Sequence, residues 1–119
     1  VIRSIMLFNS KERPMTNIQI EYTSGTRKYT PDHVITERPD GSAKTKPLMI
    51  GRYDVFLTFD RQTQLLINGQ HPELDIRLLF TNPDQTISKQ SEITYAKWCD
   101  KYGFKYSKGR SIPTEWLEE

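Results

Sequence analysis

Apolar residues alternate with polar ones in two stretches of the chain, which is the pattern of β-strands with one face in a core. Asn17–Tyr22 places Ile18, Ile20 and Tyr22 on one face. Leu74–Thr81 alternates at first and then becomes wholly apolar, as expected for a central strand covered on both faces. The pattern therefore predicts a half-buried strand early in the chain and a central strand in its second half.

Helical spacing of apolar residues marks other elements. Thr94–Tyr102 carries apolar residues at i, i+3, i+4 and i+7, which predicts an amphipathic helix ended by Gly103. Asp60–Asn68 predicts a shorter helix. We also expect a helix before Pro14, with a buried strand as the alternative, an edge strand at 104–106 and a last helical turn in residues 112–116. This order predicts an α/β (α+β) fold with a mixed central β-sheet flanked by helices.

Residues 29–52 predict a β-hairpin that carries an acidic residue, Asp32, near its base. Pro39-Asp40-Gly41 fits a three-residue turn with glycine in the third position. If Arg38 pairs with Ser42 across this turn, Asp32 lies opposite Leu48. Because side chains alternate along strands, Asp32 then shares one face with four residues of the returning strand. These are Lys44, Lys46, Leu48 and Ile50.

Composition sets the limits of the interpretation. The 119 residues predict one domain, residues 1–119, and five Phe, six Tyr and two Trp can form its core. The net charge of +2 permits DNA binding through a local basic patch but does not require it. A single cysteine, Cys99, excludes an internal disulfide. No apolar run approaches the roughly 18 residues of a membrane span, so we expect no membrane contact and a cytoplasmic location.

Two long stretches carry a specific resemblance. GQHPELDIRLLFTNP at 69–83 and TYAKWCDKYGFKYSKGRSIPTEWLE at 94–118 closely resemble the C-terminal half of the bacteriophage endonuclease I family. YTPD at 29–32, GRYD at 51–54 and DRQ at 60–62 match its central segment, and IRS at 2–4 and IEY at 20–22 match its start. These are Holliday-junction-resolving enzymes of the T-odd phages, so the resemblance implies a PD-(D/E)xK restriction-endonuclease-like core.

The resemblance also implies a chemistry, metal-dependent hydrolysis of branched DNA. Its carboxylates hold Mg²⁺ or Mn²⁺, and a lysine lies near the attacking water or the phosphate. Asp32 retains the acid of the Pro-Asp step and is the candidate metal ligand. The family's helix Glu, and the Glu and Lys of its ExK strand, align with apolar residues, namely Leu7, Leu48 and Ile50.

An alternative alignment places the ExK strand at Lys44-Thr45-Lys46, which keeps the lysine as Lys46. Symmetric growth of the two hairpin arms favours the first alignment. Asp32 and Lys46 are then the candidate catalytic residues of a rearranged site, and a salt bridge between them is the simpler role.

Basic residues around the hairpin are candidate contacts to DNA phosphates, although a solvated hairpin face explains them equally well. They are Arg38, Lys44, Lys46, Arg52 and Arg61. The basic pair that follows DRQ in the family is replaced by Thr63 and Gln64.

Three functions follow from these observations. The leading one is an endonuclease I-like protein that binds branched DNA and has lost most or all of its catalysis. The first alternative is an active junction-resolving or nicking endonuclease, using Mg²⁺ or Mn²⁺ at a rearranged site. The second is a protein-interaction module, or a subunit that interferes with a nuclease, without DNA binding, whose contact surface is the apolar face of Leu7, Leu48 and Ile50.

The resemblance further implies a homodimer in the cytoplasm of a host bacterium. The short segment between Tyr22 and Tyr29 leaves little chain for the intertwined dimer of the family, so a monomer or a different dimer is an alternative. A phage or mobile-element protein is a further candidate partner.

Overall fold

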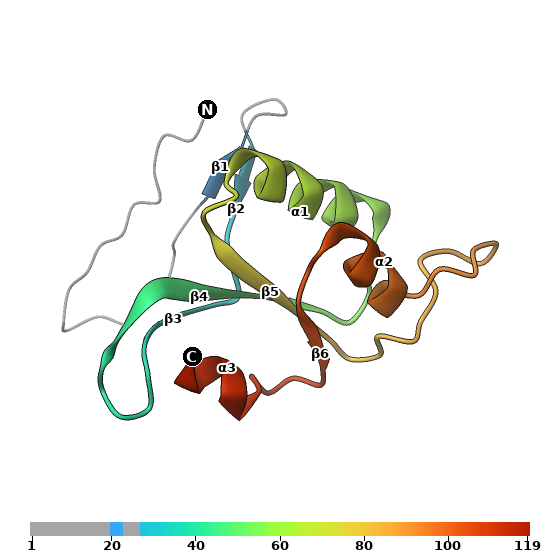
Figure 1. The fold of residues 1–119 in the computed structure, drawn as a ribbon. Coiled ribbons are helices and arrows are strands. Elements are labelled where there is room, and N and C mark those ends of the chain that lie inside the picture. Colours follow the sequence, from blue (N-terminus) through green and yellow to red (C-terminus); the bar gives the residue numbers. More distant parts are fainter. Residues whose placement is uncertain (1–19, 23–26) are drawn as a thin grey trace.

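A computed structural model describes residues 20–22 and 27–119 of the chain (Figure 1). The expected N-terminal helix with Leu7 lies outside these residues, as does the turn expected after Tyr22. β1 (Ile20–Tyr22) is the part of the first predicted strand that is described. It pairs antiparallel with β2 (Arg27–Tyr29).

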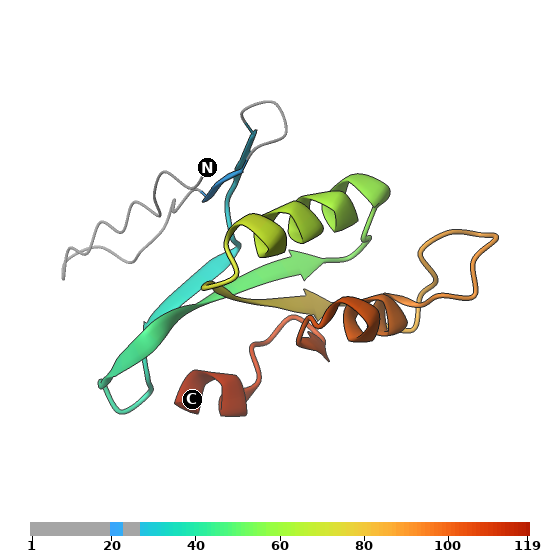
Figure 2. The same cartoon turned by 45° about the horizontal axis from the view of Figure 1, so that its top comes forward.

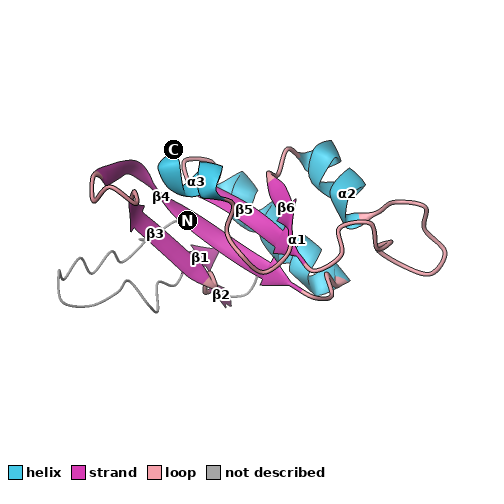
Figure 3. Ribbon diagram, turned by 90° about the horizontal axis from the view of Figure 1, so that it is seen from below, coloured by secondary structure: helices cyan, strands magenta, loops and turns pink. Residues whose placement is uncertain are grey.

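The main sheet has four strands in the order β3-β4-β5-β6, seen side by side in Figure 3. They are β3 (His33–Glu37), β4 (Ala43–Tyr53), β5 (Asp75–Phe80) and β6 (Tyr106–Lys108). β3 runs antiparallel to β4, whereas β4, β5 and β6 are parallel neighbours. The mixed sheet and its helices confirm the predicted α+β class, a fold consistent with a nuclease core.

Three helices accompany the sheet, α1 (Thr58–Gln70), α2 (Tyr95–Tyr102) and α3 (Thr114–Glu118). α1 connects the parallel strands β4 and β5, and it lies on the opposite side of the sheet from α3 (Figure 2). Local signals place α2 as predicted. The Thr94 side chain accepts a hydrogen bond from Lys97 N, and Gly103 ends the helix at φ 79°. None of the helices in residues 20–22 and 27–119 is long and apolar enough to cross a bilayer.

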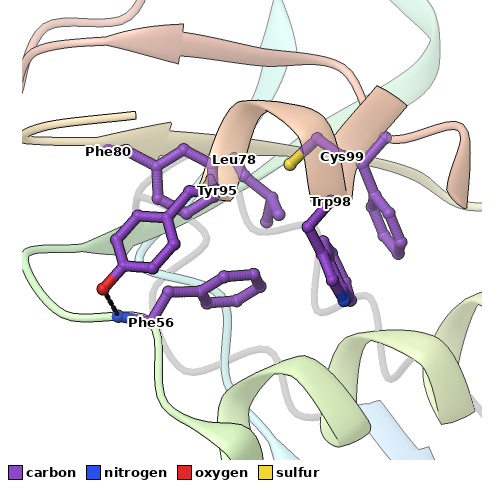
Figure 4. Close-up of a cluster of buried hydrophobic side chains, with 7 residues drawn as sticks. Phe56, Leu78, Phe80, Tyr95, Trp98 and Cys99 are labelled. Atoms are coloured by element: carbon purple, nitrogen blue, oxygen red, sulfur yellow. Dashed lines mark hydrogen bonds between the residues drawn. The ribbon is translucent and has the colours of Figure 1, made fainter. Parts of the chain in front are cut away.

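Aromatic packing fixes α2 against the sheet. Phe56, in the loop before α1, stacks edge-on against Tyr95 and Trp98, with ring centroids 5.7 and 4.9 Å away (Figure 4). The Tyr95 hydroxyl also accepts a hydrogen bond from Phe56 N at 3.1 Å. The loop that leads into α1 is therefore held by α2, which comes almost forty residues later in the chain.

The hairpin turn forms as predicted, but the register behind it does not. Arg38 N donates to Ser42 O at 2.8 Å, and Gly41 has φ 87°, as a glycine in the third turn position requires. Beyond the turn, however, four residues of β4 (44–47) face the single residue Thr36. Pro47 explains this bulge, since it has no N–H to donate to the ladder.

The bulge moves the pairing by three residues. Leu48 pairs with Ile35 and not with Asp32, whose main-chain N–H donates to Ile50 O at 2.8 Å. A shift by an odd number also exchanges the two faces of the strand. The prediction that Asp32 faces Leu48 was therefore wrong, and so was the face shared with the two lysines.

β4 passes so close to its neighbours that Gly51 has no room for a side chain. A Cβ atom at Gly51 would lie 2.7 Å from Tyr29 Oη, 3.2 Å from Tyr53 Cε2 and 3.3 Å from Leu78 Cδ2. The glycine therefore allows the Tyr29 ring to rest on the strand.

We expect Gly51→Ala to lower the free energy of unfolding by roughly 1–3 kcal/mol because the added methyl overpacks this contact. Tyr29→Phe removes the nearest atom, a buried hydroxyl for which the described residues provide no hydrogen bond of normal geometry, and should be close to neutral alone. The double variant should lose less stability than Gly51→Ala, as measured by urea unfolding. Equal losses in the single and double variants would show that Tyr29 is not the limiting contact.

Candidate functional site

Asp32 lies between β2 and β3, directly after the buried Pro31. Its side chain is exposed, and Oδ2 accepts a hydrogen bond from Arg52 N at 2.7 Å. The carboxylate is thus anchored to the end of β4, and its other oxygen has no hydrogen bond within the described residues.

Leu48 and Ile50, which we expected at the positions of the ExK acid and lysine, are buried in the sheet. Their exposed fractions are 2% and 0%. Together with Leu79 they form the Leu48 cluster, on which Ile35, Ile112 and Trp116 pack. The protein itself covers Leu48 and Ile50, so these two side chains cannot provide the apolar contact surface of the second alternative, and Leu7 lies outside the described residues.

Polar contacts hold α3 over this cluster. Lys44 Nζ donates to the main-chain oxygens of Trp116 at 2.9 Å and of Glu119 at 2.8 Å. Arg77 binds Asp75 through two bonds of 2.9 and 3.1 Å, donates to the Glu119 carboxylate, and lies 5.3 Å from the centre of the Trp116 ring. The C-terminal helix is thereby fixed to both β4 and β5.

The network also changes the acidity of its members. Burial disfavours the charge of Arg77, but its hydrogen bonds to Asp75 and Glu119 outweigh this and raise its pKa. The bond from Arg77 holds the pKa of Glu119 below its usual range.

The two candidate catalytic residues are far apart. Asp32 lies beside the segment 50–52, whereas Lys46 sits in the bulge near the hairpin tip. Five residues of strand separate Lys46 from Gly51, which is roughly 16 Å at the usual rise of a strand. The prediction that Lys46 lies one diagonal step from Asp32 was therefore wrong, and no salt bridge joins them.

The five candidate DNA-binding cations fall into two groups. Arg38 donates to Ala43 O at 2.6 Å, Arg61 donates to Phe56 O at 2.6 Å, and Lys44 holds α3 as described. Lys46 and Arg52 are exposed, and within the described residues their side chains have no hydrogen bond or ion pair. These two cations are the ones available to a ligand.

A hollow of about 430 Å³ opens next to Asp32, between β2, the end of β4 and the start of α1. Its lining combines aromatic rings, carboxylates and cations. The lining residues are Tyr22, Lys28, Tyr29, Thr30, Asp32, Arg52, Tyr53, Phe59, Asp60 and Thr63.

Two side-chain contacts involve residues that line the hollow. Gln64 Nε2 donates to Tyr53 Oη at 2.8 Å, and Thr63 Oγ1 lies 3.3 Å from Tyr22 Oη. Both α1 residues are buried, so the replacement of the family's basic pair serves the interior here. Burial raises the pKa of Tyr29 to about 12 and raises that of Tyr53 further, so both phenols stay protonated at neutral pH.

Sequence reasoning missed the hollow. Asp60 was expected as the N-cap of its helix, but α1 begins at Thr58 with Leu57 as the N-cap. Asp60 is the third helical residue, and its Oδ2 accepts a hydrogen bond from Leu57 N at 2.9 Å. Lys28 and Phe59 carried no signal, because their importance comes from the meeting of three segments. Pro47 was a usable signal for the bulge, since proline is rare inside a paired strand.

The described residues do not fit a magnesium or manganese site at the family's position. Mg²⁺ prefers several oxygen ligands, but the β4 residues beside Asp32 are Ile50 and Gly51, which have no side-chain oxygen, and Arg52, which is a cation. In residues 20–22 and 27–119, no three His, Cys, Asp or Glu side chains are close enough to hold one ion together.

A mixed sheet with an acidic Pro-Asp hairpin and a helix connecting its parallel strands defines a nuclease-like α+β protein. Residues 10–119 match the family model of phage endonuclease I. The match spans most of the chain, which therefore belongs to the phage endonuclease I family.

Two relatives illustrate the membership. Endonuclease I of Escherichia phage T7 is 31% identical over 119 residues, covering 92% of this chain and 73% of that protein. Endodeoxyribonuclease 1 of Enterobacteria phage T3 is 35% identical over 91 residues, covering 76% of this chain and 53% of that protein. The chain is therefore matched along most of its length, and the T3 protein along about half of its own.

We expect Glu119→Gln to abolish part of the acid sensitivity of the fold. A carboxyl whose pKa is lowered in the folded protein stabilises the fold at pH values above the ordinary glutamate pKa of about 4.3. This stabilisation disappears as the pH falls through the pKa of the folded state. The stability difference between wild type and Glu119→Gln should therefore be present at pH 7 and vanish at strongly acid pH, as measured by urea unfolding at each pH.

The matched control for this prediction is Glu118→Gln, which removes the same charge from the neighbouring, exposed residue. An equal pH dependence in both variants would show that general charge repulsion, and not the bond from Arg77 to Glu119, is responsible.

Proposed function

We propose that this protein binds branched DNA and that hydrolysis at the family's metal site is lost or severely weakened. The relatives are named endonuclease I and endodeoxyribonuclease 1, so DNA is the ligand class that family membership suggests. The observation that carries the loss of catalysis is the burial of Leu48 and Ile50 under Trp116. In the favoured alignment, the family's acid and lysine, which hydrolysis of this type needs, fall at these two positions, and the observed pairing turns both away from the face of Asp32.

A charge at either position is also unfavourable for the fold. Placing an ionised side chain in the Leu48 cluster removes it from water without a partner. The packing of the Leu48 cluster and α3 therefore favours apolar residues at positions 48 and 50. A charged catalytic side chain at either position is incompatible with this packing.

Binding remains possible because it needs only positive charge at the surface. Lys46 near the hairpin tip and Arg52 at the far end of β4 are exposed and have no intramolecular partner within the described residues. Contacts to phosphates at two well-separated points suit a ligand whose arms diverge, such as a junction.

Wild-type protein should retard a synthetic four-way junction in a gel-shift assay at low salt and leave all four strands intact in Mg²⁺ or Mn²⁺. Asp32→Asn should behave identically, since the amide oxygen can still accept the bond from Arg52 N. Incision by the wild type that disappears in Asp32→Asn contradicts the loss of catalysis. Absence of any shift contradicts the binding.

Lys46→Ala and Arg52→Ala should each weaken junction binding and lower the slope of log K against log[salt] by roughly one. Neither change removes a side-chain hydrogen bond described above, so the fold should be unaffected. The control is Lys97→Ala, which removes the same charge from the exposed face of α2. Equal weakening by all three variants would show a general charge effect without a defined contact at the hairpin.

A further inference from the structure

α3 lies on a cationic part of the sheet. Lys44 Nζ donates to the main-chain oxygens of Trp116 and Glu119, at 2.9 and 2.8 Å, and Arg77 donates to the Glu119 carboxylate. Figure 1 and Figure 2 both place α3 next to the outer end of the β3–β4 hairpin. Lys46, which is exposed, lies only two residues beyond Lys44 in β4. Of these two neighbouring cations of the hairpin, α3 therefore occupies one and leaves the other available.

The charge of residues 114–119 complements that of the surface on which they lie. These six residues include three glutamates and no lysine or arginine. Negative charge at the C-terminal end of a helix opposes the helix dipole, so Glu118 and Glu119 do not stabilise α3 itself. Cations of the sheet act on them instead, because the hydrogen bond from Arg77, and then the charges of Arg77 and Lys105, lower the pKa of Glu119. α3 therefore presents to these cations the same sign of charge as a DNA backbone.

α3 is also a weakly held element. It has five residues, whereas isolated helices shorter than roughly 12–15 residues are marginal in water, so its helical form depends on its contacts. None of the five residues is buried, and no side chain caps the start of the helix. Its apolar contact with the Leu48 cluster comes from Trp116, which is only partly buried, and from Ile112 just before the helix. Elements of this kind open at a lower free energy than that of global unfolding.

We propose that α3 is an autoinhibitory segment, which occupies Lys44 within the chain and thereby lowers the affinity of the hairpin for DNA. The inference rests on the proposed DNA binding and adds a contact surface, Lys44 with Lys46, and the element that regulates it. The two lysines are roughly 7 Å apart along the strand, so one DNA strand can contact both.

Lys44 can bind a phosphate only after it has left the main-chain oxygens of α3. Opening of α3 therefore adds one phosphate contact to the hairpin and takes the negative charges of Glu118 and Glu119 away from it. DNA and α3 compete for the same ammonium group, and each weakens the binding of the other by the same factor.

The first test measures binding of a fully paired duplex by fluorescence anisotropy in EDTA. Trp116→Ala removes the apolar contact of α3 and should raise the affinity roughly five- to tenfold at about 0.1 M salt, because one further phosphate contact forms. The slope of log K against log[salt] should become steeper by roughly one. When Lys44→Ala is also present, Trp116→Ala should raise the affinity much less, since the cation that α3 occupies is absent.

Glu119→Gln is the second variant, because it weakens the contact with Arg77 without uncovering the Leu48 cluster. It should raise the affinity in the same direction by a smaller factor. The matched control is Glu92→Gln, which removes the same charge from an exposed residue of the loop before α2. Equal gains in the two glutamine variants overturn the inference, and so does a gain from Trp116→Ala that is undiminished when Lys44 is replaced.

NMR observes the competition directly, since the chain has two tryptophans and therefore two indole N–H signals. When wild type is saturated with the duplex, the signal of Trp116 should move towards its position in a free peptide of residues 110–119. The signal of Trp98, which is 5% exposed in the aromatic core, should stay in place and shows that the protein remains folded. A Trp116 signal that does not move on DNA binding overturns the inference.

Failure of the inference and failure of the proposed function give different results. If the wild type binds the junction and the duplex, but neither Trp116→Ala nor Glu119→Gln gains affinity, the inference is overturned while the proposed function stands. If no form of the protein binds either DNA, both are overturned. Binding by these two variants without binding by the wild type supports the inference, because α3 then inhibits completely.

Discussion

The burial of β4 on both faces is the constraint on which the rest of the structure depends. β4 is flanked by β3 and β5, and four consecutive residues from Leu48 to Gly51 are buried. Met49 packs with Ile67 of α1 on one face, whereas Leu48 and Ile50 pack with Trp116 on the other. Each large apolar side chain buried in this way contributes roughly 1.5–3 kcal/mol, which is a considerable part of the stability of a small protein. A strand that carries this packing cannot also carry an unpaired carboxylate and an ammonium group at the same positions.

The surface of the sheet nevertheless keeps polar groups where they do not compete with this packing. Arg77 is only 6% exposed, but its guanidinium is satisfied by Asp75 and Glu119 and covered by the Trp116 ring. Asp32 stands at the margin, held by the main chain of Arg52. The polar hollow lies beside Asp32, at the edge of the apolar packing of β4. A ligand-sized cavity and an apolar central strand can therefore coexist in this family scaffold.

Local signals in the sequence were sufficient for the elements and for the turn. The Thr94 cap, Gly103 and Gly41 act within a few residues of themselves, so their effects could be predicted without knowledge of the fold. The register of the hairpin could not be obtained in this way, because it depends on a bulge that the turn does not determine. Long-range contacts were equally inaccessible. Lys44 meets the main chain of Trp116, 72 residues further on, and nothing near either residue indicates the other.

That distance along the chain has a consequence for folding. The strand that Trp116 covers is complete once residue 53 has left the ribosome, but its cover arrives only with the last few residues described here. Contacts of such high sequence separation form late, since the intervening chain must first be ordered. During synthesis, therefore, Leu48 and Ile50 remain without this cover from the time that β4 emerges until Trp116 follows.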